Sequence, residues 1–309
     1  MADMTVNKKK IIFKGTATAL ITPFAADGGV DYESFGKIID MQAEAGIDAL
    51  VVNGTTGESC CLSAEERRRN IAFAVRRTSG KVPVIAGTGC NCTALAAEYT
   101  AAAAGEGAAA VLVSSPYFNK ASEEGIAAHF YTVAEASKLP LIIYDVPSRT
   151  GIKMSAELLI KLFEHPNIAA VKEADSDIGK ITALMSRNTS GAALYSGGDE
   201  MITPLLSIGG AGAVSVVSNV YPGLTRAVCR SFFAGDVQTS ARLQLLLRPL
   251  IGELFSSVNP IPIKALMSCR GMCENLLRLP LTALPPDKCK KLLSLSENLD
   301  REERKLCVR

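Results

Sequence analysis

The feature that most constrains the fold is a regular alternation of strand-like and helix-like segments between Gly15 and about Ala234. Short, apolar, β-prone segments are separated by amphipathic stretches of helical periodicity, which is typical of a parallel sheet covered by helices. The eight expected strands are Ala17–Thr22, Ala49–Asn53, Val82–Ala86, Ala110–Ser114, Leu141–Tyr144, Ala169–Lys172, Ala193–Ser196 and Ala213–Val217. Eight strand and helix units favour an α/β fold of the closed (β/α)8 TIM barrel type, with an open doubly wound sheet as the alternative.

Several helix starts can also be predicted. Asp31, Ser122 and Ser155 stand directly before amphipathic stretches, and the segment Ser63–Glu66 has the spacing of a capping box. After about Tyr221 the pattern is helical only, and the expected helices are Leu243–Phe255, Ile261–Met267 and Asp287–Leu299. We therefore expect a catalytic barrel over residues 1–235 and a small C-terminal helical region over residues 236–309, with a charged end from Asp300 that frays.

Charge and cysteine usage exclude several functional classes. The 33 basic and 31 acidic residues leave a net charge of +2, and no basic patch indicates a nucleic-acid partner. No apolar stretch is long enough for a membrane helix or a signal peptide, so we expect a cytoplasmic protein. The nine cysteines contain no C-x-x-C pair, which argues against a metal site or a disulfide framework. We expect most of them to be buried thiols in a reducing compartment.

Lys172 is the candidate nucleophile. It ends an apolar strand-like run that begins at Ile168, and a lysine in such a poorly hydrated position is driven toward its neutral, nucleophilic amine. The alternative is that Lys172 extends to the surface and pairs with the neighbouring Glu173.

Other reactive residues are expected at the same mouth, because the carboxyl ends of TIM-barrel strands and the loops after them lie on one face. The polar groups that follow strands are Gly54–Ser59, Ser115–Asn119, Tyr144 with Arg149, and Gly197–Asp199. Taken singly, each has a structural explanation: a strand-to-helix turn, a buried aromatic ring or a surface ion pair. Their joint placement favours a catalytic site.

This set of residues suits the conversion of a 2-oxo acid into a carbon nucleophile. A neutral Lys172 amine condenses with the ketone to form an iminium, which acidifies the adjacent methyl group and allows an enamine to form. The hydroxyls of Tyr144 and Thr55 are candidates to relay protons. Backbone N–H groups of the turn at Thr55 and Thr56 are suited to a carboxylate, and the guanidinium of Arg149 to a second one.

Three motifs connect the chain to a known family. Gly54-Thr-Thr-Gly-Glu58, Tyr144-Asp-Val-Pro-Ser-Arg-Thr-Gly151 and Val171-Lys-Glu173 resemble motifs of the pyruvate-dependent class I aldolases, which include dihydrodipicolinate synthase and N-acetylneuraminate lyase. The resemblance runs from about Gly15 to Leu281, and Asn259-Pro-Ile-Pro-Ile-Lys264 is similar to the synthase branch. That branch implies a lyase of lysine and diaminopimelate biosynthesis, which condenses pyruvate with L-aspartate 4-semialdehyde to give 4-hydroxy-tetrahydrodipicolinate.

The resemblance also implies residue roles and partners. Lys172 would form the Schiff base, Tyr144 and Thr55 would relay protons, Thr55 and Thr56 would hold the pyruvate carboxylate, and Arg149 would bind the semialdehyde. The predicted substrate-binding residues further include Gly197 and Val214. No metal and no organic cofactor is implied, and neither is a nucleic-acid or membrane partner. The expected assembly is a homo-oligomer, a tetramer built from tight dimers.

One position departs from the synthase pattern in the catalytic relay. Where that branch places a second tyrosine after Ser-Pro-Tyr, donated across a subunit interface, this chain has Phe118. Because phenylalanine cannot donate or carry a proton, either the activity is reduced or the aldehyde substrate is a different one. A different aldolase of the same family and a non-catalytic sensing paralogue are therefore the alternatives.

A second departure concerns regulation. The chain resembles lysine-inhibited members of the family at Ser59, Asn91 and Tyr117, which form a possible effector site. Leu95 stands where these members usually carry an acidic residue, and Ala64 where they often carry a histidine. Because leucine cannot pair with an ammonium group, we expect lysine to inhibit weakly or not at all.

Overall fold

The computed structural model describes residues 9–307, and its strands form one closed parallel barrel in which β1 pairs with both β2 and β8. This confirms the TIM barrel and contradicts the open sheet. The strands are β1 (Gly15–Ala19), β2 (Ala49–Val52), β3 (Val84–Gly87), β4 (Ala110–Ser114), β5 (Leu141–Asp145), β6 (Ile168–Glu173), β7 (Ala193–Ser196) and β8 (Gly212–Ser215). All eight predicted strands are found, and most differ from the prediction by one to three residues at an end.

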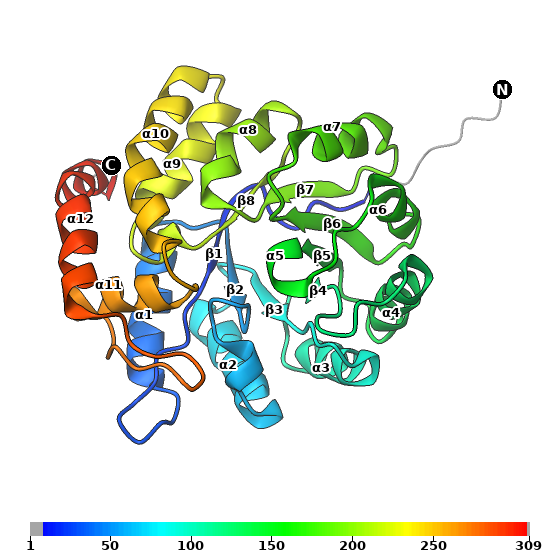
Figure 1. Ribbon diagram of the computed structural model, residues 1–309, viewed down its shortest axis with the longest axis horizontal. Coiled ribbons are helices and arrows are strands. Elements are labelled where there is room, and N and C mark those ends of the chain that lie inside the picture. Colours follow the sequence, from blue (N-terminus) through cyan, green and yellow to red (C-terminus); the bar gives the residue numbers. More distant parts are fainter. Residues whose placement is uncertain (1–8, 308–309) are drawn as a thin grey trace.

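Helices surround the barrel, and the last ones gather on one side of it (Figure 1). The helices around the barrel are α1 (Tyr32–Glu44), α2 (Ala64–Thr78), α3 (Thr93–Gly105), α4 (Glu123–Glu135), α5 (Pro147–Thr150), α6 (Ala156–Leu162), α7 (Ile178–Arg187), α8 (Ile202–Ser207) and α9 (Pro222–Phe233). The C-terminal helices are α10 (Val237–Leu254), α11 (Ile261–Cys269) and α12 (Pro286–Cys307). Helices α10 and α12 pack against α9, and the proposed boundary between residues 235 and 236 falls in the turn before α10.

The strands are buried on both faces, which is why they read as continuous apolar runs. Side chains that alternate along a strand enter two separate cores. Ile142 and Tyr144 on β5 belong to the core inside the barrel, whereas Ile143 belongs to the core between the sheet and the helices. The same alternation on β6 directs Ala170 into the barrel and Val171 toward the helices. Lys172 therefore points into the barrel and Glu173 toward the helices.

The predicted helix starts are confirmed. The side chains of Asp31, Ser122 and Ser155 accept hydrogen bonds from the first turns of α1, α4 and α6, and Ser63 and Glu66 form the complete capping box of α2. These signals are local in sequence, and each stabilises its helix by about 1 kcal/mol.

The charged end from Asp300, which was expected to fray, continues helix α12 as far as Cys307. Its Glu303 accepts hydrogen bonds from Gly223 N at 2.7 Å and Leu224 N at 2.6 Å and so caps the N-terminus of α9. The expectation that most cysteines are buried is wrong. Of the eight described cysteines, all free thiols, only Cys90, Cys229 and Cys273 are buried. No helix in residues 9–307 is long and apolar enough to cross a membrane.

Candidate active site

A cavity of about 210 Å³ opens among the loops at the carboxyl ends of the strands. It is lined from β1, β2, β4, β5 and β6, from the loops that follow the strands, and from the C-terminal region. Of the residues predicted from sequence, the cavity brings together Thr55, Thr56, Tyr144, Arg149, Lys172 and Gly197. Six predicted residues from four separate parts of the barrel therefore share one space.

Lys172 lies inside this cavity and is only 5% exposed. It is paired in the sheet with Tyr144, and its Nζ lies 4.0 Å from the centre of the Tyr144 ring. The alternative of a surface ion pair with Glu173 is contradicted: Glu173 pairs with Lys180, and Lys172 forms no ion pair with any residue in the described part of the chain. The Lys172 amine is therefore free to react with a small molecule in the cavity.

A buried ion pair between Glu58 and Lys264 fixes the turn that carries Thr55 and Thr56. Glu58 lies in the left-handed region of the backbone, at φ 53°, and its carboxylate accepts from Lys264 Nζ at 2.6 Å and from the backbone N–H of Arg278 at 3.0 Å. The side chains of Glu58 and Lys264 have no exposed surface. Burial lowers the pKa of Lys264, and the attraction of Glu58 opposes this shift. The C-terminal region thus fixes the loop after β2.

Asn259 is a cavity residue that the sequence reasoning did not identify. Its side-chain amide donates to Thr56 Oγ1 at 2.9 Å, and its backbone carbonyl accepts from Arg149 Nη2 at 3.0 Å. Because the Thr56 hydroxyl accepts this bond, its own proton is left to be donated into the cavity. The sequence signal for this residue is the Asn-Pro-Ile-Pro motif, which begins at Asn259.

Two further predicted substrate-binding residues differ in their placement. Gly197 lines the cavity, and a side chain there would begin 2.9 Å from the Ala174 Cβ and from the Glu173 carbonyl, so only glycine fits this close approach. Val214 does not reach the cavity; it is buried in the core inside the barrel, and Val216, after the end of β8, lines the cavity instead.

A second cavity of about 210 Å³ adjoins the first and shares Thr55, Val146 and Arg149 with it. It contains Ser59 and Tyr117 of the possible effector site, together with Cys60 and Arg67. Burial raises the pKa of the Tyr117 hydroxyl. Asn91 does not line this cavity, but its backbone carbonyl accepts from Asn119 in the same loop cluster at 3.2 Å.

Phe118 lies outside both cavities. Its side chain is 90% exposed, and its backbone has φ 74°, a left-handed conformation that is costly for a residue with a large side chain. The Phe118 ring therefore projects into solvent and does not contribute to the cavity around Lys172 in the same chain.

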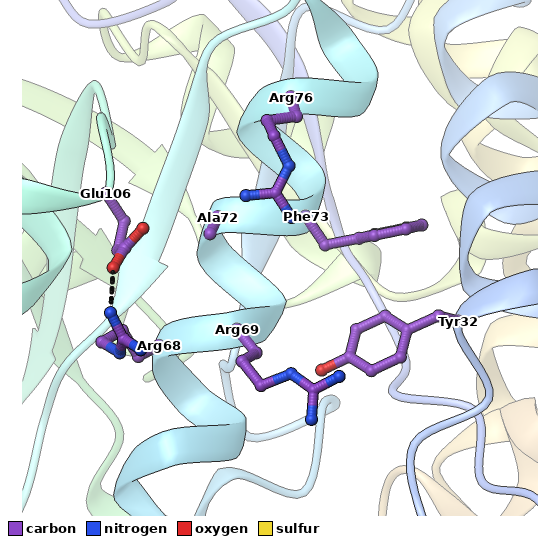
Figure 2. Close-up of a pocket in the computed structure, with 7 residues that line it drawn as sticks. All are labelled: Tyr32, Arg68, Arg69, Ala72, Phe73, Arg76 and Glu106. Atoms are coloured by element: carbon purple, nitrogen blue, oxygen red, sulfur yellow. Dashed lines mark hydrogen bonds and ion pairs between the residues drawn. The ribbon is translucent and has the colours of Figure 1, made fainter.

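Another hollow, of about 200 Å³, lies along α2 and is lined by residues of α1, of α2 and of the turn after α3 (Figure 2). Two pairs of its side chains contact each other: Arg68 pairs with Glu106 at 2.9 Å, and Arg69 stacks over the Tyr32 ring at 5.2 Å. It contains none of the strand-end residues. We therefore assign the candidate active site to the cavity around Lys172.

In the described part of the chain, no group of three or more His, Cys, Asp or Glu side chains is arranged to hold a metal ion.

Comparisons with known proteins agree with this geometry. Residues 12–298 match the model of the dihydrodipicolinate synthetase family. A relative from Exiguobacterium sp., named 4-hydroxy-tetrahydrodipicolinate synthase, is 42% identical over 289 residues, which cover 94% of this chain and 99% of the relative.

Solved structures of dihydrodipicolinate synthases have the same fold. The structure from Aquifex aeolicus is 39% identical with a TM-score of 0.91, and the alignment covers 93% of this chain and 98% of that one. The structure from Acinetobacter baumannii, solved in complex with pyruvate, is 38% identical with a TM-score of 0.91, and the coverage is 93% of this chain and 99% of that one.

Proposed function

This chain belongs to the dihydrodipicolinate synthetase family, and from that premise we propose that it is a lyase that condenses pyruvate with L-aspartate 4-semialdehyde. The product is 4-hydroxy-tetrahydrodipicolinate, a precursor in lysine and diaminopimelate biosynthesis. The observation that carries the proposal is the buried Lys172, which has no ion-pair partner among the described residues and lies beside Tyr144 in a cavity of small-molecule size.

In the proposed first half-reaction, the Lys172 amine attacks the ketone carbon of pyruvate, and water leaves to give an iminium. Tyr144 and Thr55 are the proposed proton carriers for these steps, because both line the same cavity. The hydroxyl of Thr56 and the backbone of the turn are the proposed carboxylate site. Loss of a methyl proton from the iminium then gives the enamine.

In the second half-reaction, the enamine carbon attacks the aldehyde carbon of the semialdehyde and forms the new carbon–carbon bond. The amino group of the semialdehyde then attacks the iminium carbon and expels the Lys172 amine, which closes the ring and regenerates the enzyme. One water is released overall. Arg149, oriented by the Asn259 carbonyl, is the proposed partner of the semialdehyde carboxylate. No step requires a metal or an organic cofactor.

A coupled assay tests this function directly. Pyruvate and the semialdehyde are supplied together with the reductase that consumes the product, and nicotinamide oxidation is followed. We expect oxidation only when both substrates are present. If no aldehyde turnover occurs although pyruvate still reacts with Lys172, the aldehyde is a different one. Phe118 is the observation that favours this second candidate, another pyruvate-dependent aldolase.

Phe118→Tyr is expected to raise turnover by about 10-fold or more, because it restores a hydroxyl able to transfer protons. Phe255→Tyr is the control, since it adds a hydroxyl to a phenylalanine that, unlike Phe118, lines the cavity of its own chain, and it should give no gain. Equal turnover in the Phe118 variant and the wild type would show that the relay does not need this hydroxyl.

We propose that Phe118 packs against a second copy of the chain in a homo-oligomer, a tetramer of tight dimers. Its 90% exposure and left-handed backbone support this, because a protruding aromatic ring is typical of an interface anchor. One structural relative, 36% identical, is described as a monomeric dihydrodipicolinate synthase variant. We further propose that the enzyme acts in the cytoplasm, which is supported by its biosynthetic role.

Inhibition by L-lysine is expected to be weak or absent. The second cavity carries two guanidinium groups, those of Arg67 and Arg149. Both are positively charged and therefore repel the side-chain ammonium of lysine. A thermal-shift titration with L-lysine and D-lysine should therefore give no stereospecific stabilisation. A saturable shift of the melting temperature with L-lysine alone would contradict this prediction.

A further inference from the structure

A buried cluster of charges lies directly behind the Lys172 and Tyr144 pair. Asp145 and Glu173 follow these two residues in sequence, and they pair with each other in the register of β5 and β6. Because side chains alternate along a strand, Tyr144 and Lys172 face the inside of the barrel while Asp145 and Glu173 face the surrounding helices. Neither carboxylate side chain has any exposed surface.

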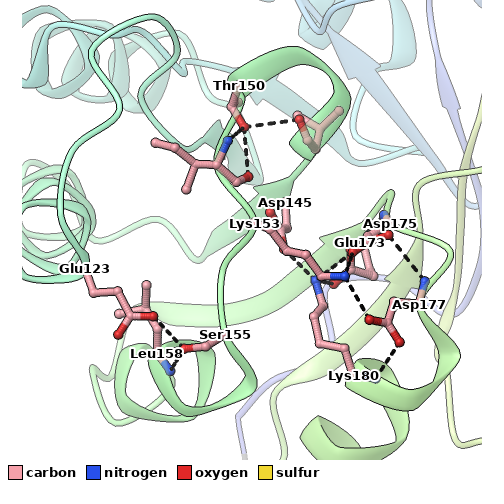
Figure 3. A network of polar contacts seen from close by, with 12 residues as sticks. Glu123, Asp145, Thr150, Lys153, Ser155, Leu158, Glu173, Asp175, Asp177 and Lys180 are labelled. Atoms are coloured by element: carbon pink, nitrogen blue, oxygen red, sulfur yellow. Dashed lines mark hydrogen bonds and ion pairs between the residues drawn. The ribbon is translucent and has the colours of Figure 1, made fainter.

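Lys180, on α7, reaches both carboxylates at once. Its Nζ lies 2.7 Å from Asp145 Oδ2 and 2.8 Å from Glu173 Oε2, and its side chain is 7% exposed. Figure 3 shows Lys180 between the two strand ends, with Lys153 and Asp175 at the edge of the same cluster. A third carboxylate, Asp175, is more distant, at 3.9 Å, and pairs instead with Lys153 at 2.9 Å. One ammonium therefore joins the ends of two adjacent strands.

The electrostatics make this connection depend on Lys180. Burial and the neighbouring charge of Asp145 raise the pKa of Glu173 to about 7, and burial also raises the pKa of Asp145. Burial opposes the charged form of Lys180, but the attraction of Glu173 and Asp145 outweighs it and raises the pKa of Lys180. Without the ammonium, two carboxylates that have no exposed surface would face each other unpaired.

We propose that Lys180 is a positioning residue for the reaction: by holding Asp145 and Glu173, it fixes the ends of β5 and β6 relative to each other, and with them the Lys172 amine relative to Tyr144. The inference rests on the proposed function of Lys172. It predicts an effect on the rate of the chemical steps and not on the capture of pyruvate, because the carboxylate site at Thr55 and Thr56 belongs to a different loop.

The test compares three variants of the full-length chain. Lys180→Met removes the ammonium at similar size, Lys180→Arg keeps a positive charge, and Lys153→Met changes a half-exposed lysine at the edge of the same cluster. Pyruvate and borohydride are added over a range of pyruvate concentrations, and the rate of covalent labelling is measured at a temperature at which circular dichroism shows each variant to be folded. The coupled assay gives kcat in parallel.

For Lys180→Met we expect the limiting labelling rate and kcat to fall by about 30-fold, with the half-saturating pyruvate concentration unchanged, because small displacements of reacting groups are costly. Lys180→Arg should recover most of the rate, and Lys153→Met should match the wild type. A purely structural role would lower only the melting temperature, so a folded Lys180→Met with wild-type rates would overturn the inference.

If Lys180→Met does not fold, Asp145→Ala decides the question. It leaves a one-to-one pair of Lys180 with Glu173, in which one ammonium faces one carboxylate, but it releases β5 from the connection. We expect kcat to fall by about 10-fold with the same half-saturation, and unchanged kinetics would overturn the inference. A wild-type chain that does not react with pyruvate would instead contradict the proposed function, so the two failures are distinguishable.

Discussion

Lys172→Met is expected to abolish turnover while leaving the chain at least as stable as the wild type. The loss of kcat/KM should be on the order of 10⁴-fold or more, because no other described lysine lines the cavity to form the Schiff base. Stability should be retained because Lys172 is buried without an ion pair to any described residue, and a methionine of similar size needs no hydration. Coupled kinetics and thermal melting measure the two effects.

The control for this variant is Lys37→Met, which alters an exposed lysine on α1. Its turnover and melting temperature should match those of the wild type. Activity in Lys172→Met within 10-fold of the wild type would show that a different group activates the substrate. A large fall in its melting temperature would show that Lys172 has a structural role that its contacts do not explain.

Lys264→Met, unlike Lys172→Met, is expected to destabilise the chain, with a loss of about 3–5 kcal/mol in the free energy of unfolding. This substitution leaves the Glu58 carboxylate, which has no exposed surface, without the ammonium that it pairs with at 2.6 Å. Because Glu58 lies in the turn of Thr55 and Thr56, the half-saturating pyruvate concentration should also rise. Urea unfolding and steady-state kinetics check both effects.

The exposed pair of Lys37 and Glu33 provides the matched comparison, since its side chains are 69% and 80% exposed. Lys37→Met should change the free energy of unfolding by no more than about 0.5 kcal/mol. Adding Glu58→Gln to Lys264→Met should recover part of the lost stability, because the unpaired charge is then removed. Equal stability of Lys264→Met and Lys37→Met would contradict this account of the buried pair.

The parts of the fold that could be predicted from sequence are those with local causes. Strands buried on both faces are apolar along their whole length, as in β5, and helix starts such as Ser63 carry their own hydrogen-bonding side chains. Barrel topology then brings the strand ends together, and for this reason Tyr144 and Lys172 could be assigned to one site before their distance was known.

The residues that were not predicted act through contacts that are distant in sequence. Asn259 meets Thr56 across 203 positions, and Lys264 meets Glu58 across 206. Lys180 could not be predicted for a different reason. A lysine in an amphipathic segment is expected on the solvated face of the helix, whereas in the structure Lys180 points toward buried carboxylates. Val214 lies too early along β8 to reach the site: its side chain is buried in the core inside the barrel, and Val216, two residues further on, lines the cavity.

If Lys172 forms a covalent imine with pyruvate, borohydride reduction followed by mass spectrometry detects it directly. We expect one adduct per chain, with the mass of pyruvate less one water plus two hydrogens, on the peptide that contains Lys172 and absent from Lys172→Met. An unmodified wild-type chain, or an adduct on another lysine such as Lys264, would contradict it.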